Sequence, residues 1–122
     1  VLAADKLPDS LVLDATAIFA APDRSESLAR FGGDLLITAN DDELAALTER
    51  PIDAEPEQAV SEVAKRFDAI AMLKRSDTLI ASPAGEVLRY PGGGVGLATG
   101  GSGDVLAGIL AALLARGQEP LA

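Results

Sequence analysis

The 122-residue chain has the length of one domain, and its 48% hydrophobic and 24% charged residues are sufficient for a folded core. Nineteen acidic against ten basic residues give a net charge of −9, which disfavours binding to nucleic acids and to anionic membranes. The chain has no cysteine and no histidine, which excludes disulfides, thiolate zinc sites and histidine-based triads. A general base must therefore be a carboxylate, a lysine or a tyrosine.

Short apolar runs predict the strands. The runs at residues 11–14, 34–38 and 69–73 have the length of buried strands and are bounded by polar or turn-forming residues. Residues 78–82 and 86–90 flank a Pro-Ala-Gly sequence, and this spacing predicts a β-hairpin.

Helices are expected in the segments between these strands. A short helix at residues 25–31 would be capped by Ser25, and a second helix, capped by Asn40 or Asp41, would run to about residue 47. A third helix begins at a proline, and its apolar stripe is formed by Val60, Val63, Ala64 and Phe67.

The alternation of strands and helices is typical of an α/β fold with a mainly parallel sheet. Ligands bind such sheets at the carboxyl ends of the strands. In this chain those ends are Asp14, residues 38–40 and Lys74. We therefore expect the ligand site at this edge of the sheet.

A glycine-rich stretch at residues 92–104 leads into an apolar, alanine-rich helix that is expected to end near residue 117. Glycines let an anion approach the unpaired N–H groups at the start of a helix. The residues predicted to form this anion hole are Gly100, Gly101, Ser102 and Gly103. Asp104 follows in the first helical turn, where it either complements the helix dipole or acts as a base.

The glycine-rich stretch is neither a Walker A motif, since the Lys-Ser/Thr pair is missing, nor a dinucleotide fingerprint, since the third glycine is missing. An anion hole with its own carboxylate suits phosphoryl transfer to an alcohol. The backbone N–H groups would stabilise the transferring phosphoryl, and Asp104 would accept the hydroxyl proton.

Three segments carry a resemblance to a known family. The stretch Leu97-Ala-Thr-Gly-Gly-Ser-Gly-Asp-Val-Leu-Ala-Gly108 resembles the ADP/ATP-dependent NAD(P)H-hydrate dehydratases of the ribokinase-like superfamily. Residues 11–18 resemble the family's Val-Leu-Asp-Ala-Asp-Ala-Leu segment, and residues 72–78 resemble its Leu-Lys-Gly-x-x-Thr nucleotide segment. The resemblance implies a three-layer α/β/α fold with a mainly parallel sheet. Residues 1–122 would be one partial domain, the C-terminal part of that fold including its β-hairpin.

The resemblance also implies a reaction: ADP or ATP, with Mg²⁺, phosphorylates the ring hydroxyl of hydrated NAD(P)H, and phosphate is then eliminated. Asp104 would contact the hydrate and act as the base, and the anion hole would bind the nucleotide phosphates. Asn40 would contact the substrate. The residues implied to line the nucleotide site are Lys74, Arg75, Ser76, Asp77 and Thr78.

Several positions depart from the family pattern, among them Asn40 in place of a histidine, Thr16 in place of the second aspartate, and Arg75 in place of a glycine. The pattern Asn40-x-x-Glu43 is also that of ribokinase-like sugar and vitamin kinases, whose glutamate helps to organise Mg²⁺. It is equally the pattern of a helix capping box. Two alternatives therefore stay open: a kinase acting on a small alcohol such as a thiamin precursor, and a nucleotide-binding homologue without turnover.

The expected partner is a small molecule, with no nucleic acid and no membrane. No signal peptide is visible, and the longest apolar run, residues 105–115, is too short to cross a bilayer. A cytoplasmic protein is therefore expected. The sequence leaves open whether the protein forms a homo-oligomer. Because the chain lacks an initial methionine and has few strands, we expect a fragment of a larger fold.

Overall fold

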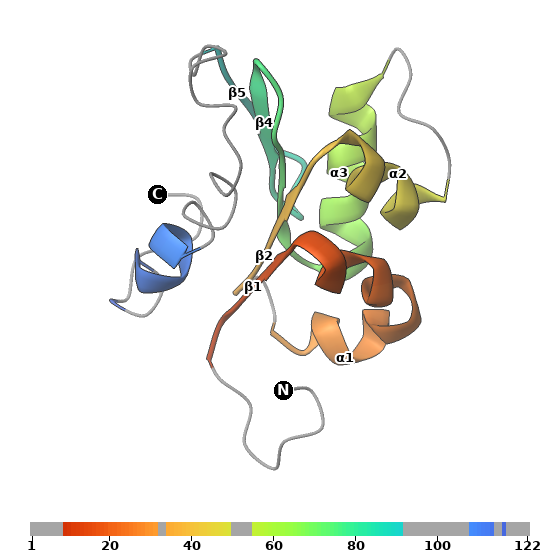
Figure 1. Cartoon of the computed structure of the whole chain (residues 1–122), viewed down its shortest axis with the longest axis vertical. Helices are drawn as coiled ribbons and strands as arrows, with labels where there is room; N and C mark the ends of the chain where they lie inside the picture. The colour runs from red at the N-terminus through yellow and green to blue at the C-terminus, as the bar shows by residue number, and fades with distance from the viewer. Residues whose placement is uncertain (1–8, 32–33, 50–54, 92–107, 114–115, 117–122) are drawn as a thin grey trace.

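The fold is built on a five-stranded sheet in which the strands lie side by side in chain order (Figure 1). The computed structural model describes residues 9–31, 34–49, 55–91, 108–113 and 116. The strands are β1 (Leu11–Asp14), β2 (Leu35–Ala39), β3 (Ile70–Leu73), β4 (Thr78–Ala81) and β5 (Val87–Tyr90). The first three strands are parallel, and β4 and β5 are antiparallel to their neighbours. The predicted strands and hairpin are thus confirmed.

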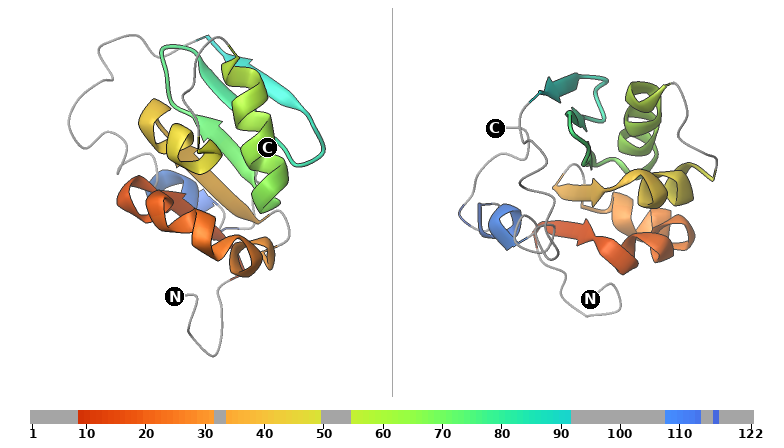
Figure 2. Two further views of the ribbon diagram at one scale, coloured as in Figure 1. Left: turned by 90° about the vertical axis from the view of Figure 1, so that its right-hand side faces the viewer. Right: turned by 45° about the horizontal axis from the view of Figure 1, so that its top comes forward.

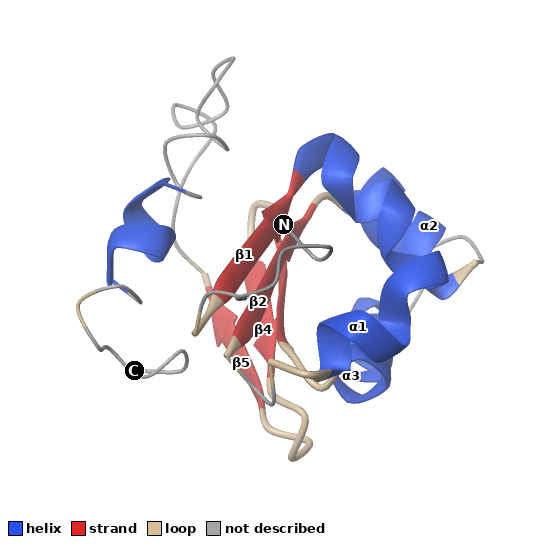
Figure 3. Ribbon diagram, turned by 90° about the horizontal axis from the view of Figure 1, so that it is seen from below, coloured by secondary structure: helices blue, strands red, loops and turns tan. Residues whose placement is uncertain are grey.

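The helical segments that precede β3 cover one face of the sheet (Figure 3). They are the 3₁₀ helix η1 (Ala15–Arg24), α1 (Ser25–Ala29), α2 (Asp41–Thr48) and α3 (Pro56–Phe67). Figure 2 shows them stacked along the sheet. The α/β class predicted from the alternating pattern is confirmed, and the sheet and these helices make up two layers. Residues 108–113, within the expected C-terminal helix, are helical, and the start of that helix lies outside the described residues.

The hydrophobic core lies between the sheet and this helical layer. The apolar stripe predicted for α3 is buried in full, and Leu44 and Leu47 of α2 face the same core. All five residues of β2 are buried, as is usual for a central parallel strand. The core therefore fixes β2 and β3, whose carboxyl ends form part of the edge at which the sequence predicts the ligand site.

Two local expectations for the segment after β1 are corrected. The sequence predicts no element between residues 14 and 25, whereas η1 occupies Ala15–Arg24. The N-cap position of α1 is Arg24, whose side chain makes no capping hydrogen bond, so the prediction that Ser25 is the cap is wrong. The reason is that η1 runs directly into α1, so the chain at residue 25 is already helical.

Candidate functional site

The parallel strands bring three polar residues to one edge of the sheet. Asp14 is the last residue of β1 and lies opposite Thr38 of β2 in the strand register. Lys74 follows β3 directly, and its backbone N–H donates a hydrogen bond of 2.7 Å to the carbonyl of Ala39 at the end of β2. The carboxyl ends therefore meet at one edge, as the strand pattern predicts.

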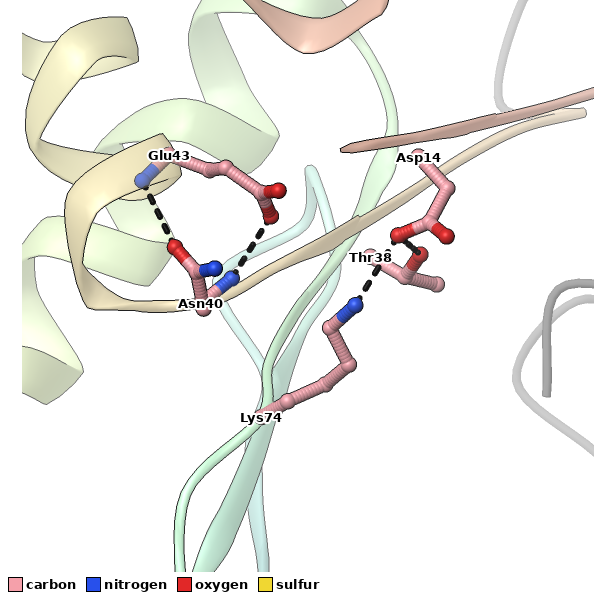
Figure 4. Close-up of polar contacts among 5 residues, drawn as sticks. All are labelled: Asp14, Thr38, Asn40, Glu43 and Lys74. Atoms are coloured by element: carbon pink, nitrogen blue, oxygen red, sulfur yellow. Dashed lines mark hydrogen bonds and ion pairs between the residues drawn. The ribbon is translucent and has the colours of Figure 1, made fainter. Parts of the chain in front are cut away.

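The side chains of these three residues are joined at one oxygen atom (Figure 4). Thr38 Oγ1 donates a hydrogen bond of 2.7 Å to Asp14 Oδ1. Lys74 Nζ donates to the same Oδ1 at 2.9 Å and forms an ion pair with it. We call Asp14, Thr38 and Lys74 the strand-end cluster. It presents one ammonium group at the edge where α/β sheets bind ligands.

Asn40 and Glu43 form the capping box of α2 (Figure 4). Glu43 N–H donates to Asn40 Oδ1 at 2.9 Å, and Asn40 N–H donates to Glu43 Oε2 at 2.9 Å. Asn40 is exposed, while Glu43 is only 8% exposed. The capping-box interpretation of this pattern is confirmed, because each side chain satisfies one N–H group that the helix leaves unpaired.

The loop between β3 and β4, residues 74–77, makes ion pairs with other elements through most of its residues. Arg75 Nε lies 3.2 Å from Asp41 Oδ1 in the first turn of α2. Asp77 Oδ2 accepts a hydrogen bond of 3.1 Å from Arg89 of β5. These contacts join the predicted nucleotide segment to both the helical layer and the hairpin.

Arg89 is the centre of a second group of charges. Its guanidinium pairs with Glu57 in the first turn of α3 as well as with Asp77. These hydrogen bonds, first with Glu57 and then with Asp77, raise the pKa of the Arg89 guanidinium above its ordinary value. A pocket of about 290 Å³ lies beside this group and is lined by Pro56, Arg75, Ser76, Asp77, Leu79 and Arg89.

The structure brings together some of the sequence-predicted site residues. Arg75, Ser76 and Asp77 line one pocket, and Thr78 begins β4 beside them. Asn40 and Glu43 lie where β2 passes into α2. The predicted base and anion hole, Asp104 and residues 100–103, lie outside the described residues.

Sequence reasoning did not identify several residues that the structure places near these segments. The strand pattern marks Thr38 and Asp14 only as strand ends and does not indicate that Asp14 pairs with Lys74. Asp41 and Arg89, which pair with the β3–β4 loop, carried no signal in the sequence, because only the fold makes them neighbours of that loop.

Two kinds of feature are absent from the described residues. In that part of the chain, no group of three or more His, Cys, Asp or Glu side chains is placed to hold a metal ion. Nor does the same part of the chain contain a helix with the length and apolar character needed to cross a membrane.

Comparisons of the sequence agree on one family. A family model described as NAD(P)H-hydrate dehydratase matches residues 1–122. The chain is 40% identical over 111 residues to the bifunctional NAD(P)H-hydrate repair enzyme Nnr of Gloeobacter violaceus, covering 91% of this chain and 22% of that protein. It is 40% identical over 112 residues to an ADP-dependent (S)-NAD(P)H-hydrate dehydratase of Neisseria meningitidis, covering 88% of this chain and 38% of that protein.

Solved structures agree on the fold. A ribokinase-like superfamily protein of Enterococcus faecalis matches with a TM-score of 0.70 and 28% identity, covering 88% of this chain and 37% of that one. YxkO of Bacillus subtilis matches with a TM-score of 0.66 and 25% identity, covering 90% of this chain and 39% of that one. The chain thus spans from 22% to 39% of the length of these four proteins. Its sequence and its ribokinase-like fold together show that it belongs to the NAD(P)H-hydrate dehydratase family.

Proposed function

We propose that the full-length protein repairs hydrated NAD(P)H by a nucleotide-dependent dehydration. The observation that carries the proposal is the family match over residues 1–122, which includes both the strand-end cluster and the glycine-rich stretch. ADP is the proposed nucleotide, because the relative from Neisseria meningitidis is named as ADP-dependent. A cytoplasmic location and a small-molecule substrate are part of the same proposal.

The reaction would proceed in two steps. In the first, the ring hydroxyl oxygen attacks the terminal phosphorus of ADP, the bond from that phosphorus to the bridging oxygen breaks, and AMP leaves. Asp104 takes the hydroxyl proton, and the N–H groups of residues 100–103 stabilise the charge on the phosphoryl oxygens. In the second step, phosphate leaves the ring carbon as the neighbouring carbon loses a proton, which restores the ring double bond.

Several of the described residues are proposed to contact the nucleotide or the substrate. Lys74, partly exposed at the ligand edge, supplies a positive charge for a phosphate oxygen. Arg75, Ser76 and Asp77 line the pocket proposed to hold part of the nucleotide, with Thr78 beside it. Asn40 is exposed at the start of α2, and its side-chain NH₂ group can donate a hydrogen bond to the substrate.

Mg²⁺ is proposed as the ion that accompanies the nucleotide phosphates. This ion keeps several water and phosphate ligands, so one or two protein carboxylates are enough to hold it. Glu43 is the proposed carboxylate, although the capping box already uses its Oε2. Any role toward Mg²⁺ would therefore use the remaining oxygen or a water molecule between the two.

One assay tests the proposed function. The full-length protein is incubated with hydrated NADH, ADP or ATP, and Mg²⁺, and the return of NADH absorbance is followed. We expect recovery that depends on the nucleotide. Phosphorylation of a thiazole or pyrimidine alcohol without NADH recovery would instead identify the kinase alternative, and no nucleotide consumption with any substrate would identify a homologue without turnover.

Replacement of the proposed base gives the matching prediction. Asp104→Asn removes the proton acceptor while keeping the shape of the side chain, so the rate of NADH recovery should fall at least about 100-fold. Binding of ADP, measured by calorimetry, should persist, because the proposed anion hole uses backbone N–H groups, which this substitution leaves in place. Activity close to that of the unchanged protein would show that Asp104 is not the base.

A further inference from the structure

Lys74 is fixed in place from two directions. Its backbone N–H is bonded to Ala39 at the end of β2, and its Nζ is bonded to Asp14 at the end of β1. A lysine side chain normally moves among many rotamers, and holding it in one of them removes freedom that a ligand would otherwise have to remove. The ammonium of Lys74 therefore has a defined position before any ligand arrives.

The three side chains of the strand-end cluster differ in their exposure, which increases from Thr38 through Asp14 to Lys74. Thr38 is fully buried, the side chain of Asp14 is 13% exposed, and that of Lys74 is 25% exposed. The innermost member carries no charge and donates its hydroxyl to the carboxylate, and the outermost member carries the cation. This order leaves part of the Lys74 side chain accessible at the surface, while Asp14 and Thr38 lie further inside.

We propose that Asp14 and Thr38 are positioning residues that hold the Lys74 ammonium in place for the phosphates of the nucleotide. The inference rests on the proposed function for its ligand. Asp14 acts by directing the ammonium, and Thr38 acts by fixing the carboxylate oxygen that receives it. Protein kinases divide the task in the same way, since a glutamate from another element holds the lysine that contacts the nucleotide phosphates.

The main alternative is an ion pair that serves only to stabilise the fold. The two interpretations predict opposite results for ligands with and without phosphate. A positioning role requires that removal of Asp14 weakens the binding of ADP and leaves the binding of adenosine unchanged. A purely structural role lowers the unfolding temperature and changes neither affinity when binding is measured well below that temperature.

A double-mutant cycle on ADP binding tests the role of Asp14 in the full-length protein. Lys74→Met should lower ADP affinity by about tenfold or more, because a charged hydrogen bond to phosphate is lost. Asp14→Asn should lower it by about three- to tenfold. The double variant should bind ADP no more weakly than Lys74→Met, because Asp14 acts only through the lysine. All three variants should bind adenosine as the unchanged protein does.

The role of Thr38 is tested with two replacements that carry no charge. Thr38→Val keeps the shape of the buried side chain and removes the hydroxyl, so ADP affinity should fall about two- to fivefold. Thr38→Ser retains the hydroxyl and should bind ADP like the unchanged protein. Equal ADP affinity in these two variants would overturn the role of Thr38.

Three outcomes would overturn the role of Asp14: unchanged or tighter ADP binding by Asp14→Asn, equal losses for adenosine and ADP, or an effect that adds in full to that of Lys74→Met. These outcomes for the positioning role can be distinguished from a failure of the proposed dehydration reaction. A protein that shows the expected cycle but restores no NADH retains the positioning role and loses the proposed reaction. A full-length protein that binds no ADP loses both.

Discussion

Glu43 performs a structural task that a glutamine could also perform. Its Oε2 accepts the Asn40 N–H, and a glutamine side-chain oxygen can accept the same bond. Glu43→Gln should therefore leave the free energy of unfolding nearly unchanged, whereas Glu43→Ala should lower it by about 1 kcal/mol. Urea denaturation of the full-length protein measures both. Equal losses in the two variants would show that the carboxylate charge, not the capping bond, stabilises α2.

The same pair of variants isolates the proposed metal role of Glu43. Because Glu43→Gln keeps the cap and removes the charge, it should raise the Mg²⁺ concentration needed for half-maximal NADH recovery. A titration of activity with Mg²⁺ measures this shift. An unchanged Mg²⁺ requirement would assign Glu43 to the capping box alone.

Gly85 adopts a backbone conformation that other residues rarely occupy. Its φ is +100°, in the turn between β4 and β5, and an added Cβ would meet no atom within 4 Å. The penalty of a side chain is therefore conformational and not steric crowding. Gly85→Ala should destabilise the protein by roughly 1 kcal/mol in urea denaturation. Ala84→Ser, at the neighbouring exposed position, should change stability little, and an equally small effect of Gly85→Ala would contradict the prediction.

Helix α3 owes its position to its buried face, and Phe67 is the largest side chain on that face. Phe67 is fully buried in the core between the sheet and the helices. Phe67→Ala should lower the free energy of unfolding by about 3–5 kcal/mol through lost burial and the cavity that remains. Phe67→Leu fills much of the space and should lose clearly less. Chemical denaturation compares the two, and similar losses would mean that the site does not retain a cavity.

Helices and strands whose apolar residues follow a regular pattern are predictable from this sequence. The stripe of α3 repeats with the period of an α-helix, and the strands appear as short apolar runs bounded by polar residues. The 3₁₀ helix η1 was not predicted, because its buried residues Ile18 and Ala21 are three positions apart and Pro22 lies within it. A period of three matches neither pattern used to find helices and strands.

Nucleotide binding should stabilise the molecule as a whole. A ligand that binds only the folded state adds about 2.7 kcal/mol at a concentration 100 times its dissociation constant. ADP should therefore raise the unfolding temperature of the full-length protein in a concentration-dependent way, and adenosine should raise it less. The Lys74→Met variant should show a smaller shift with ADP at the same concentration. A thermal melt without any ADP-dependent shift would argue against nucleotide binding.

The sequence predicts which edge of the sheet holds the strand-end cluster, but it does not predict which side chains pair with one another there. Parallel strands place their carboxyl ends at one edge, so Asp14 and Lys74 could be assigned to that edge from the strand pattern. They are 60 residues apart, and no local rule says which side chains at the edge will pair. The pairing of Arg75 with Asp41 depends in the same way on how α2 packs beside the loop.

The β3–β4 loop is tied through Lys74 to β1, through Arg75 to α2 and through Asp77 to β5. In terms of conformational entropy, a loop whose side chains are already held has less freedom to lose when a ligand binds. Ion pairs between exposed groups weaken as salt is added, while the buried core does not. The pairs of Arg75 and Asp77 are more exposed than the Lys74–Asp14 pair, so rising ionic strength would weaken the ties to α2 and β5 first. A loop with this added freedom would bind the proposed nucleotide more weakly.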